Sequence, residues 1–146
     1  VKPVLMYGSE TWKMNRSNEK KIDVFQSKCL RQILKISWKE REPNVEILKM
    51  ADIEPLSWEA RKRRWKFIGH VLRKGKESIC GTSLTWTPEG RRKRGRPKTT
   101  WRRTVEKERN RAGWKTWMSV QKIAEDRVKW RLLVEASCAT WHEEDR

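Results

Sequence analysis

Residues 57–74, with the sequence SWEARKRRWKFIGHVLRK, decide the predicted fold. At 3.6 residues per turn, the apolar side chains of this stretch fall on one face of a helix, and they are Trp58, Trp65, Ile68, Val71 and Leu72. Ser57 is a favourable N-cap, and Gly75 stands just beyond Lys74, where a glycine often ends a helix. The segment therefore predicts a helix that buries one face in a core.

The opposite face of this predicted helix is basic. Its cationic positions are Lys62, Arg63, Lys66, His70, Arg73 and Lys74. Almost no Asp or Glu interrupts this stripe, so the sequence favours an anion-binding face over an ordinary solvated one. Arg61 and Arg64 fall within the apolar arc, and we expect each of them to reach solvent or to meet a buried partner.

Helical spacing and capping residues predict further helices on both sides of this one. They are expected at about 18–36, with Ser17 or Asn18 as the cap, at 44–51, at 101–112, with Thr99 or Thr100 as the cap, and at 117–138. Residues 76–99 are interrupted by Gly, Thr and Pro and are interpreted as a basic linker, with at most a short strand or hairpin near 83–87. The predicted fold is mostly α, with about five helices in one or two small bundles.

The net charge points to a polyanionic partner. The 146 residues contain 36 Lys and Arg against 19 Asp and Glu, a formal net charge of +17, and most of the excess lies between residues 61 and 111. A localised excess is an electrostatic footprint, and interleaved aromatic residues favour nucleic acid over a membrane surface. No apolar run is long enough to span a bilayer, and the 3 Cys suit a reducing compartment rather than a disulfide scaffold.

The second basic cluster contains a recognisable motif. The cluster comprises Arg91, Arg92, Lys93, Arg94, Gly95, Arg96, Pro97 and Lys98. Its Arg-Gly-Arg-Pro core looks like an AT-hook, in which two arginines enter the minor groove of A·T-rich DNA while glycine lets the backbone approach the groove floor. The same cations can instead contact phosphates of any nucleic acid, which the sequence favours, or remain solvated.

The 10 Trp residues have two expected roles. Trp86 and Trp101 flank the second basic cluster and are candidates for stacking on bases, although burial is the commoner fate of such a side chain. Those at helical positions are expected in the core, and they are Trp58, Trp65, Trp117 and Trp130.

Catalytic and metal-binding signals are weak. Cys138 and His142 have a spacing compatible with zinc, but no Cys-x-x-Cys half-site accompanies them. Glu125 and Asp126 are adjacent on a predicted helix, so their side chains diverge by about 100° and would not meet at one ion. No serine elbow, phosphate loop or HExxH motif is present. We therefore assign no catalytic residue and no metal ligand, and we expect no enzymatic turnover from this chain alone.

Five ordered blocks resemble a known family. The blocks are YGSETW at 7–12, FQSKCLR at 25–31, RRWKFIGHVLR at 63–73, WTPEGRRKRGRP at 86–97 followed by Thr100-Trp101, and DRVKWRLLV at 126–134. Together they cover nearly the whole chain and resemble the C-terminal region of reverse transcriptases from non-LTR (LINE-like) retrotransposons of the endonuclease–reverse transcriptase type.

The resemblance implies a domain organisation and a role. Residues 1–16 would end an upstream polymerase domain, 17–75 would form a thumb-like helical bundle, 76–99 a basic linker and 100–146 a C-terminal helical segment. The implied partners are template RNA, RNA–DNA hybrid or target DNA together with the upstream polymerase domain, with no membrane, and the implied location is intracellular and nuclear when acting. The palm's paired aspartates are not matched, since Asp52 is single. Mg²⁺ would therefore serve the parent polymerase, and no cofactor is expected in this chain.

Three other functions remain open at the level of sequence. A stand-alone AT-hook-like chromatin protein would prefer A·T-rich duplex, and replacing Arg94 and Arg96 by Lys should erase that preference. A scaffold domain would use its basic surface for an acidic protein, and bulk RNA would then not compete. A self-contained nuclease would cleave nucleic acid in the presence of Mg²⁺ or Mn²⁺.

Overall fold

The described part of the chain is helical. The computed structural model describes residues 2–75, 78–86, 89–90, 95 and 99–144, and no strand occurs within these residues. Their eight α-helices are α1 (Lys2–Leu5), α2 (Arg16–Ile33), α3 (Asn44–Met50), α4 (Leu56–Arg73), α5 (Ile79–Thr85), α6 (Trp101–Arg111), α7 (Trp117–Glu125) and α8 (Arg127–Glu144). Two short 3-10 helices, η1 (Ser9–Thr11) and η2 (Trp38–Glu40), complete the set. The predicted all-α class is confirmed, with more and shorter helices than expected.

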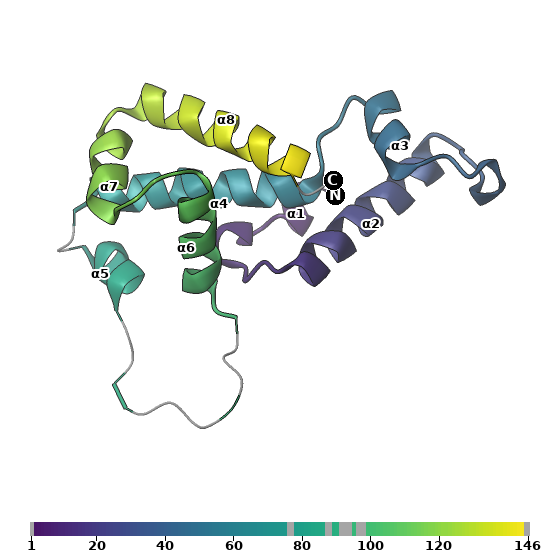
Figure 1. Ribbon diagram of the computed structural model, residues 1–146. Coiled ribbons are helices and arrows are strands. Elements are labelled where there is room, and N and C mark those ends of the chain that lie inside the picture. The colour runs from purple at the N-terminus through teal and green to yellow at the C-terminus, as the bar shows by residue number, and fades with distance from the viewer. Residues whose placement is uncertain (1, 76–77, 87–88, 91–94, 96–98, 145–146) are drawn as a thin grey trace.

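Helix α4 lies at the centre of the fold. In Figure 1, α8 runs antiparallel beside α4, α6 extends below α4 and meets it at its upper end, and α7 lies at the end of α4 where α8 begins. The main core forms between these helices and contains Trp65, Ile68, Val105, Trp114, Val120, Ala124, Trp130, Val134 and Cys138. The predicted apolar face of 57–74 is thereby confirmed, with Trp58 and Leu72 packing at the edge of the same core.

Tryptophans form the centre of this core, as predicted for the helical positions. The Trp65 ring meets Trp114 edge-on with centroids 4.9 Å apart, and it lies 6.2 Å from Trp130. The indole Nε1 of Trp130 donates a hydrogen bond to the Trp65 carbonyl at 3.1 Å, so the buried polar atom is satisfied. Gly69 makes this crossing possible, because a Cβ there would stand 2.1 Å from Trp130 Nε1.

The caps of α2 and α4 differ from the predicted ones. Asn15 caps α2 by accepting the Asn18 N–H at 2.8 Å, so Ser17 and Asn18 are not the cap. Pro55 occupies the N-cap of α4, and Ser57 lies inside the helix. Asp23 of α2 supplies the missing acceptors, taking the Ser57 N–H at 2.9 Å and its hydroxyl at 2.7 Å. A side chain from another helix replaces the local cap. The sequence of α4 alone cannot predict such a distant partner.

The predicted single helix at 117–138 is wrong. Asp126 leaves helical geometry, with ψ at 106°, and separates α7 from α8. Its Oδ1 atom accepts the N–H groups of Val128 at 2.9 Å and Lys129 at 3.0 Å, which starts α8 with a side-chain cap. Asp is among the strongest capping residues, and here the cap outweighs the continuous apolar periodicity.

The strand considered near 83–87 is also wrong for the residues that the structure describes there. Residues 79–85 form α5, and Ser78 caps it by accepting the Gly81 N–H at 3.0 Å. Gly81 comes so close to the end of α4 that a Cβ would stand 2.3 Å from the Gly75 carbonyl oxygen. Gly81 therefore serves helix packing rather than a turn in a linker.

The N-terminal segment is tied to α6. Trp101 Nε1 donates to the Glu10 carbonyl at 2.9 Å, and Thr104 Oγ1 donates to the Met14 carbonyl at 3.0 Å. Thr100 caps α6 by accepting the Arg103 N–H, as one of the two predicted alternatives. Residues before and after the predicted linker thus pack together, since α4 shares its core with α6, α7 and α8.

Candidate nucleic-acid interface

The basic stripe of α4 is largely paired with groups of neighbouring helices. Lys62 Nζ lies 3.0 Å and Lys66 Nζ 3.7 Å from Glu135 Oε1 of α8. Arg63 Nε lies 3.1 Å from Glu59 Oε1, one turn earlier on α4. Lysine contact lowers the pKa of the Glu135 carboxyl, first through a hydrogen bond from Lys62 and then through its charge. These ion pairs lie at the surface, where the side chains of the paired residues are 28–43% exposed.

At the C-terminal end of the stripe, one cation contacts α7 and two are exposed to solvent. Arg73 donates to the Ala124 carbonyl at 2.8 Å, at the end of α7, where a cation also complements the helix dipole. Burial lowers the pKa of Arg73, and the nearby Arg127 charge lowers it further. His70 and Lys74 are exposed. The expectation that almost no carboxylate neutralises this stripe is therefore wrong for Lys62 and Lys66, because Glu135 of α8 lies beside both.

Arg61 and Arg64 meet buried partners, as one of the two predicted alternatives. Arg64 is fully buried, and its Nη1 lies 2.6 Å from Glu108 Oε1 of α6. Trp65 Nε1 donates to the other carboxylate oxygen at 2.8 Å, and Arg61 bridges to Glu19 of α2 at 2.9 Å. Burial raises the pKa of Glu108, and the neighbouring Arg64 and Arg61 charges oppose that rise. This buried cluster joins α2, α4 and α6.

The second predicted basic cluster lies mostly outside the described residues. Nothing is described there for Arg91, Arg92, Lys93, Arg94, Arg96 and Lys98. The two flanking tryptophans differ in setting: Trp86 is 64% exposed at the end of α5, whereas Trp101 is half-buried and held by its bond to Glu10. Of the two stacking candidates, Trp86 is the accessible one.

A basic groove lies between the start of α2 and α6. Its volume is about 880 Å³, and its basic residues are Arg16, Arg61, Arg103, Lys107 and Arg111. Two carboxylates, Glu19 and Glu108, lie in the groove as well, and both are bonded to the buried arginines described above. Among the described residues that line the groove, the exposed cations outnumber the carboxylates.

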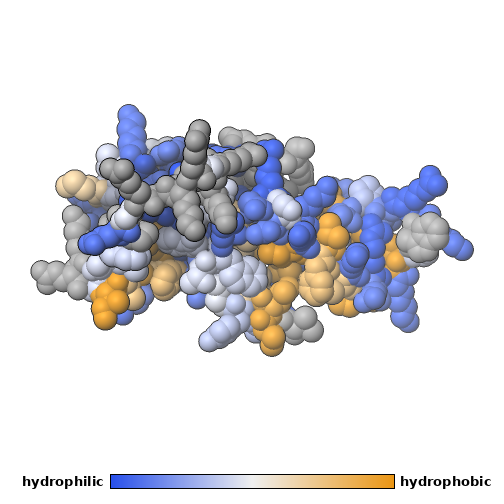
Figure 2. All heavy atoms as spheres, turned by 90° about the horizontal axis from the view of Figure 1, so that it is seen from below, coloured by the Kyte–Doolittle hydropathy of each residue, from blue (hydrophilic) through white to orange (hydrophobic). Residues whose placement is uncertain are grey.

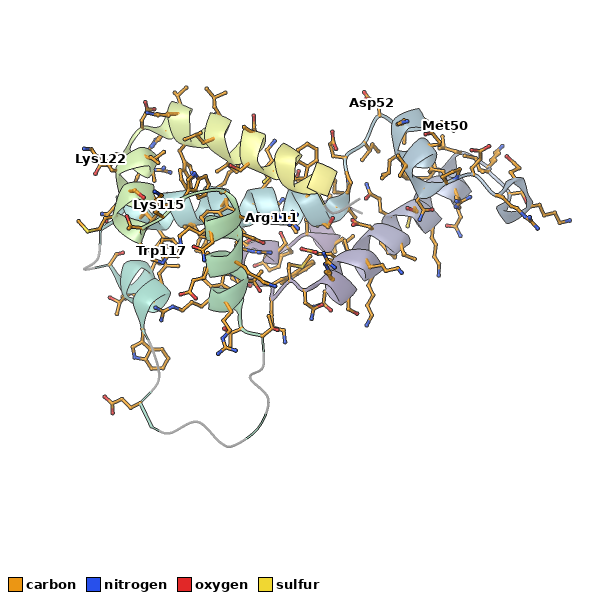
Figure 3. All side chains as sticks on the ribbon, viewed as in Figure 1. Met50, Asp52, Arg111, Lys115, Trp117 and Lys122 are labelled. Atoms are coloured by element: carbon orange, nitrogen blue, oxygen red, sulfur yellow. The ribbon has the colours of Figure 1, made fainter. Side chains whose placement is uncertain are left out.

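The α6 wall presents a regular line of charge. Arg103, Lys107 and Arg111 are all exposed and follow one another at intervals of four residues, which places them on one face and about 6 Å apart along the helix axis. Figure 3 shows Arg111 at the end of α6 that leads towards α7. Such a line can contact successive phosphates of one strand.

Two helix N-termini add partial positive charge to the groove. Asn15 and Arg16 at the start of α2 line it, as does Thr99, which precedes the Thr100 cap of α6. Backbone N–H groups at helix starts favour anions. Thr99 directly follows Lys98, so the second basic cluster joins the groove in sequence. Seen from below, hydrophilic groups lie at both ends of the molecule, and hydrophobic groups form separate patches at the lower left, at the lower centre and right of centre (Figure 2).

Sequence reasoning missed the groove residues. Arg16, Arg103, Lys107 and Arg111 each look like an ordinary solvated helix cation. The four-residue spacing on α6 was a signal that could have identified one wall, but the pairing of α6 with α2 depends on contacts between segments 90 residues apart. The groove is lined mainly by cations that were not among the predicted site residues. Most cations of the predicted α4 stripe are paired with other groups of the protein instead.

The possible zinc site at Cys138 and His142 is not supported at Cys138. Cys138 is fully buried in the main core, and burial raises the pKa of its thiol to about 12. Metal binding needs the thiolate. Within the described residues, no three side chains of His, Cys, Asp or Glu come together in a way that could hold a metal ion.

Among the described helices, none combines the length and apolar character needed to span a bilayer.

The cysteines should differ sharply in reactivity. We expect a thiol-alkylating reagent at pH 8 to modify the exposed Cys80 in the native protein and to leave Cys138 unmodified, because a pKa of about 12 leaves Cys138 almost no thiolate. Timed alkylation followed by peptide mass spectrometry measures both sites, and addition of denaturant should equalise them. Modification of Cys138 at the rate of Cys80 in folded protein would contradict the packing described here.

Family models, curated proteins and solved structures were each compared with this chain, and none matches it.

Proposed function

We propose that this chain binds nucleic acid through the basic groove between α2 and α6, as part of the C-terminal region of a LINE-like reverse transcriptase. The observation that carries the binding role is the groove itself, where exposed cations from two helices face one another. The polymerase identity rests on the five sequence blocks. Template RNA, RNA–DNA hybrid and target DNA are the candidate ligands, and the chemical step belongs to the parent polymerase.

The charge arrangement supports phosphate contact rather than an acidic protein surface. The groove cations stand at regular helical spacing and are joined by helix N-termini, which suits a repeating anion. The net charge of +17 adds a long-range attraction that speeds encounter with a polyanion. If the groove and the second basic cluster together contact about six to ten phosphates, affinity should fall by roughly 10³–10⁵ between 50 and 200 mM salt.

Charge reversal in the groove tests this proposal. The double variant Arg103→Glu with Lys107→Glu should weaken binding of a single-stranded 20-nucleotide RNA by about 100-fold, since each lost phosphate contact is worth roughly tenfold. The slope of log affinity against log salt should also become shallower by about 1.4, since each phosphate contact on a single strand contributes about 0.7. Fluorescence anisotropy over a salt series measures both quantities.

The matched control is Lys122→Glu with Lys129→Glu. Both lysines are exposed, and the change in net charge is identical. Lys122 lies on α7, away from the side of α6 that faces α2 (Figure 3). We expect this control to weaken binding by less than about fivefold, through the general field alone. Equal loss in the two variants would show that binding depends on total charge and not on the groove.

A further inference from the structure

A second, smaller cavity lies beside α6. It is bounded by the end of α4 and by α5, α6 and α7, and its volume is about 170 Å³. Its walls are mainly apolar and include Leu72, Leu84, Trp117 and Met118, and two polar side chains, Arg102 and Gln121, also line it. Since Arg102 and Arg103 are neighbours on α6, this apolar slot and the basic groove lie around the same helix.

The walls of the apolar slot are fixed by packing. Gly81 brings α5 against the Gly75 carbonyl, closer than any residue with a Cβ could come. On the other side, the Trp117 ring stacks on Trp65 with centroids 6.5 Å apart and lies under Arg109 at 5.5 Å. These two walls are therefore in place before any ligand enters, which lowers the entropic cost of binding.

The size and chemistry of the apolar slot suit one flat aromatic ring. An apolar cavity of about 150 Å³ holds a benzene ring, so the slot matches a ligand of that class. Gln121 can both donate and accept hydrogen bonds, which matches the mixed edge of a nucleobase. The Arg102 guanidinium beside it donates to Glu106 at 3.3 Å and carries further N–H groups.

We infer that the apolar slot receives one unpaired base of the strand whose phosphates lie in the basic groove. This inference rests on the proposed function. A helix with its side chains is about 10–12 Å across, so one strand can reach both sites around α6. In an uninterrupted duplex the bases stay stacked, and extruding one costs a few kcal/mol. The chain should therefore prefer single-stranded nucleic acid to a duplex of the same sequence.

The test compares a single-stranded 20-mer carrying one 2-aminopurine with its duplex. Leu84→Trp fills the apolar slot and should weaken binding of the single strand by roughly 5- to 150-fold, the range that stacking of one base spans, while duplex binding changes by less than about twofold. Leu132→Trp is the matched control, because Leu132 is an exposed apolar residue of α8, and it should change neither affinity. In the unmodified protein, 2-aminopurine fluorescence should change on binding of the single strand.

A second pair of variants keeps the inference testable if Leu84→Trp does not fold. Met118 is 78% exposed, so Met118→Asp should fold and should weaken single-strand binding, whereas Val128→Asp on α8 should not. Equal affinities of the wild-type protein for both ligands, or equal loss of both in the slot variants, would overturn the base-slot inference. Loss of binding in the Arg103→Glu, Lys107→Glu variant would still support the groove. No loss in that variant would refute the proposed function itself.

Discussion

Replacing Glu108 by Ala should lower the free energy of unfolding by about 3–5 kcal/mol. Glu108 is the counterion of Arg64, which is fully buried and 2.6 Å away, and it also accepts a hydrogen bond from Trp65. Removing the carboxylate leaves a guanidinium in the interior without its charge partner, which is costlier than losing a surface contact. Urea denaturation followed by Trp fluorescence measures the change.

Glu106→Ala is the matched control for this variant. Glu106 lies on the same helix and pairs with Arg102 at 3.3 Å, but the side chains of both are about 40% exposed. An exposed pair of this kind contributes less than about 1 kcal/mol. A Glu108 variant as stable as the Glu106 variant would mean that the buried cluster does not hold α4 and α6 together.

Gly69→Ala should destabilise the protein by several kcal/mol, against the direction that helix propensity predicts. In an exposed helix, Gly→Ala stabilises by about 0.5–1 kcal/mol. Here the new Cβ would stand 2.1 Å from Trp130 Nε1 and 2.6 Å from its Cδ1. Trp130 is 2% exposed and bonded to the Trp65 carbonyl, so its ring has little room to move. The sign of the change, measured by denaturant unfolding, decides between propensity and packing.

A double-mutant cycle separates this contact from other causes. Trp130→Leu alone should be destabilising, because a large aromatic side chain leaves the core. Combined with it, Gly69→Ala should cost much less than it does in the wild-type background, since the clashing ring is gone. Additive losses in the double variant would show that the strain of Gly69→Ala arises elsewhere.

Periodicity was sufficient to predict the central helix and its buried face. The position of Arg61 and Arg64 in an apolar arc also predicted that each would either reach solvent or meet a buried partner, and the second alternative holds. What periodicity cannot supply is the partner's identity, because Glu108 is 44 residues from Arg64 in sequence. The same limit explains the missed caps: Asp23 accepts from Ser57 across 34 residues. The break at Asp126 was missed because apolar residues continue with helical spacing on both sides of it.

The candidate site was harder to predict than the fold. A stripe of cations has the same pattern whether solvent, a phosphate or a neighbouring carboxylate faces it, and in α4 the neighbours are Glu135 and Glu59. The third of the chain where the net charge is concentrated, residues 61–111, contains three of the groove cations, Arg103, Lys107 and Arg111, but not Arg16. Assigning the groove required the docking of α6 on the N-terminal segment, which tertiary contacts determine.

The bond between Trp130 and the Trp65 carbonyl spans 65 residues, and this separation matters while the protein is being made. The ribosome adds about 5–20 residues each second, so roughly 3–13 s pass between the synthesis of the two tryptophans. During this interval the apolar side of α4 has no α8 to cover it. The nascent chain is then exposed to aggregation, and we expect its yield in cells to depend on chaperones that shield such surfaces.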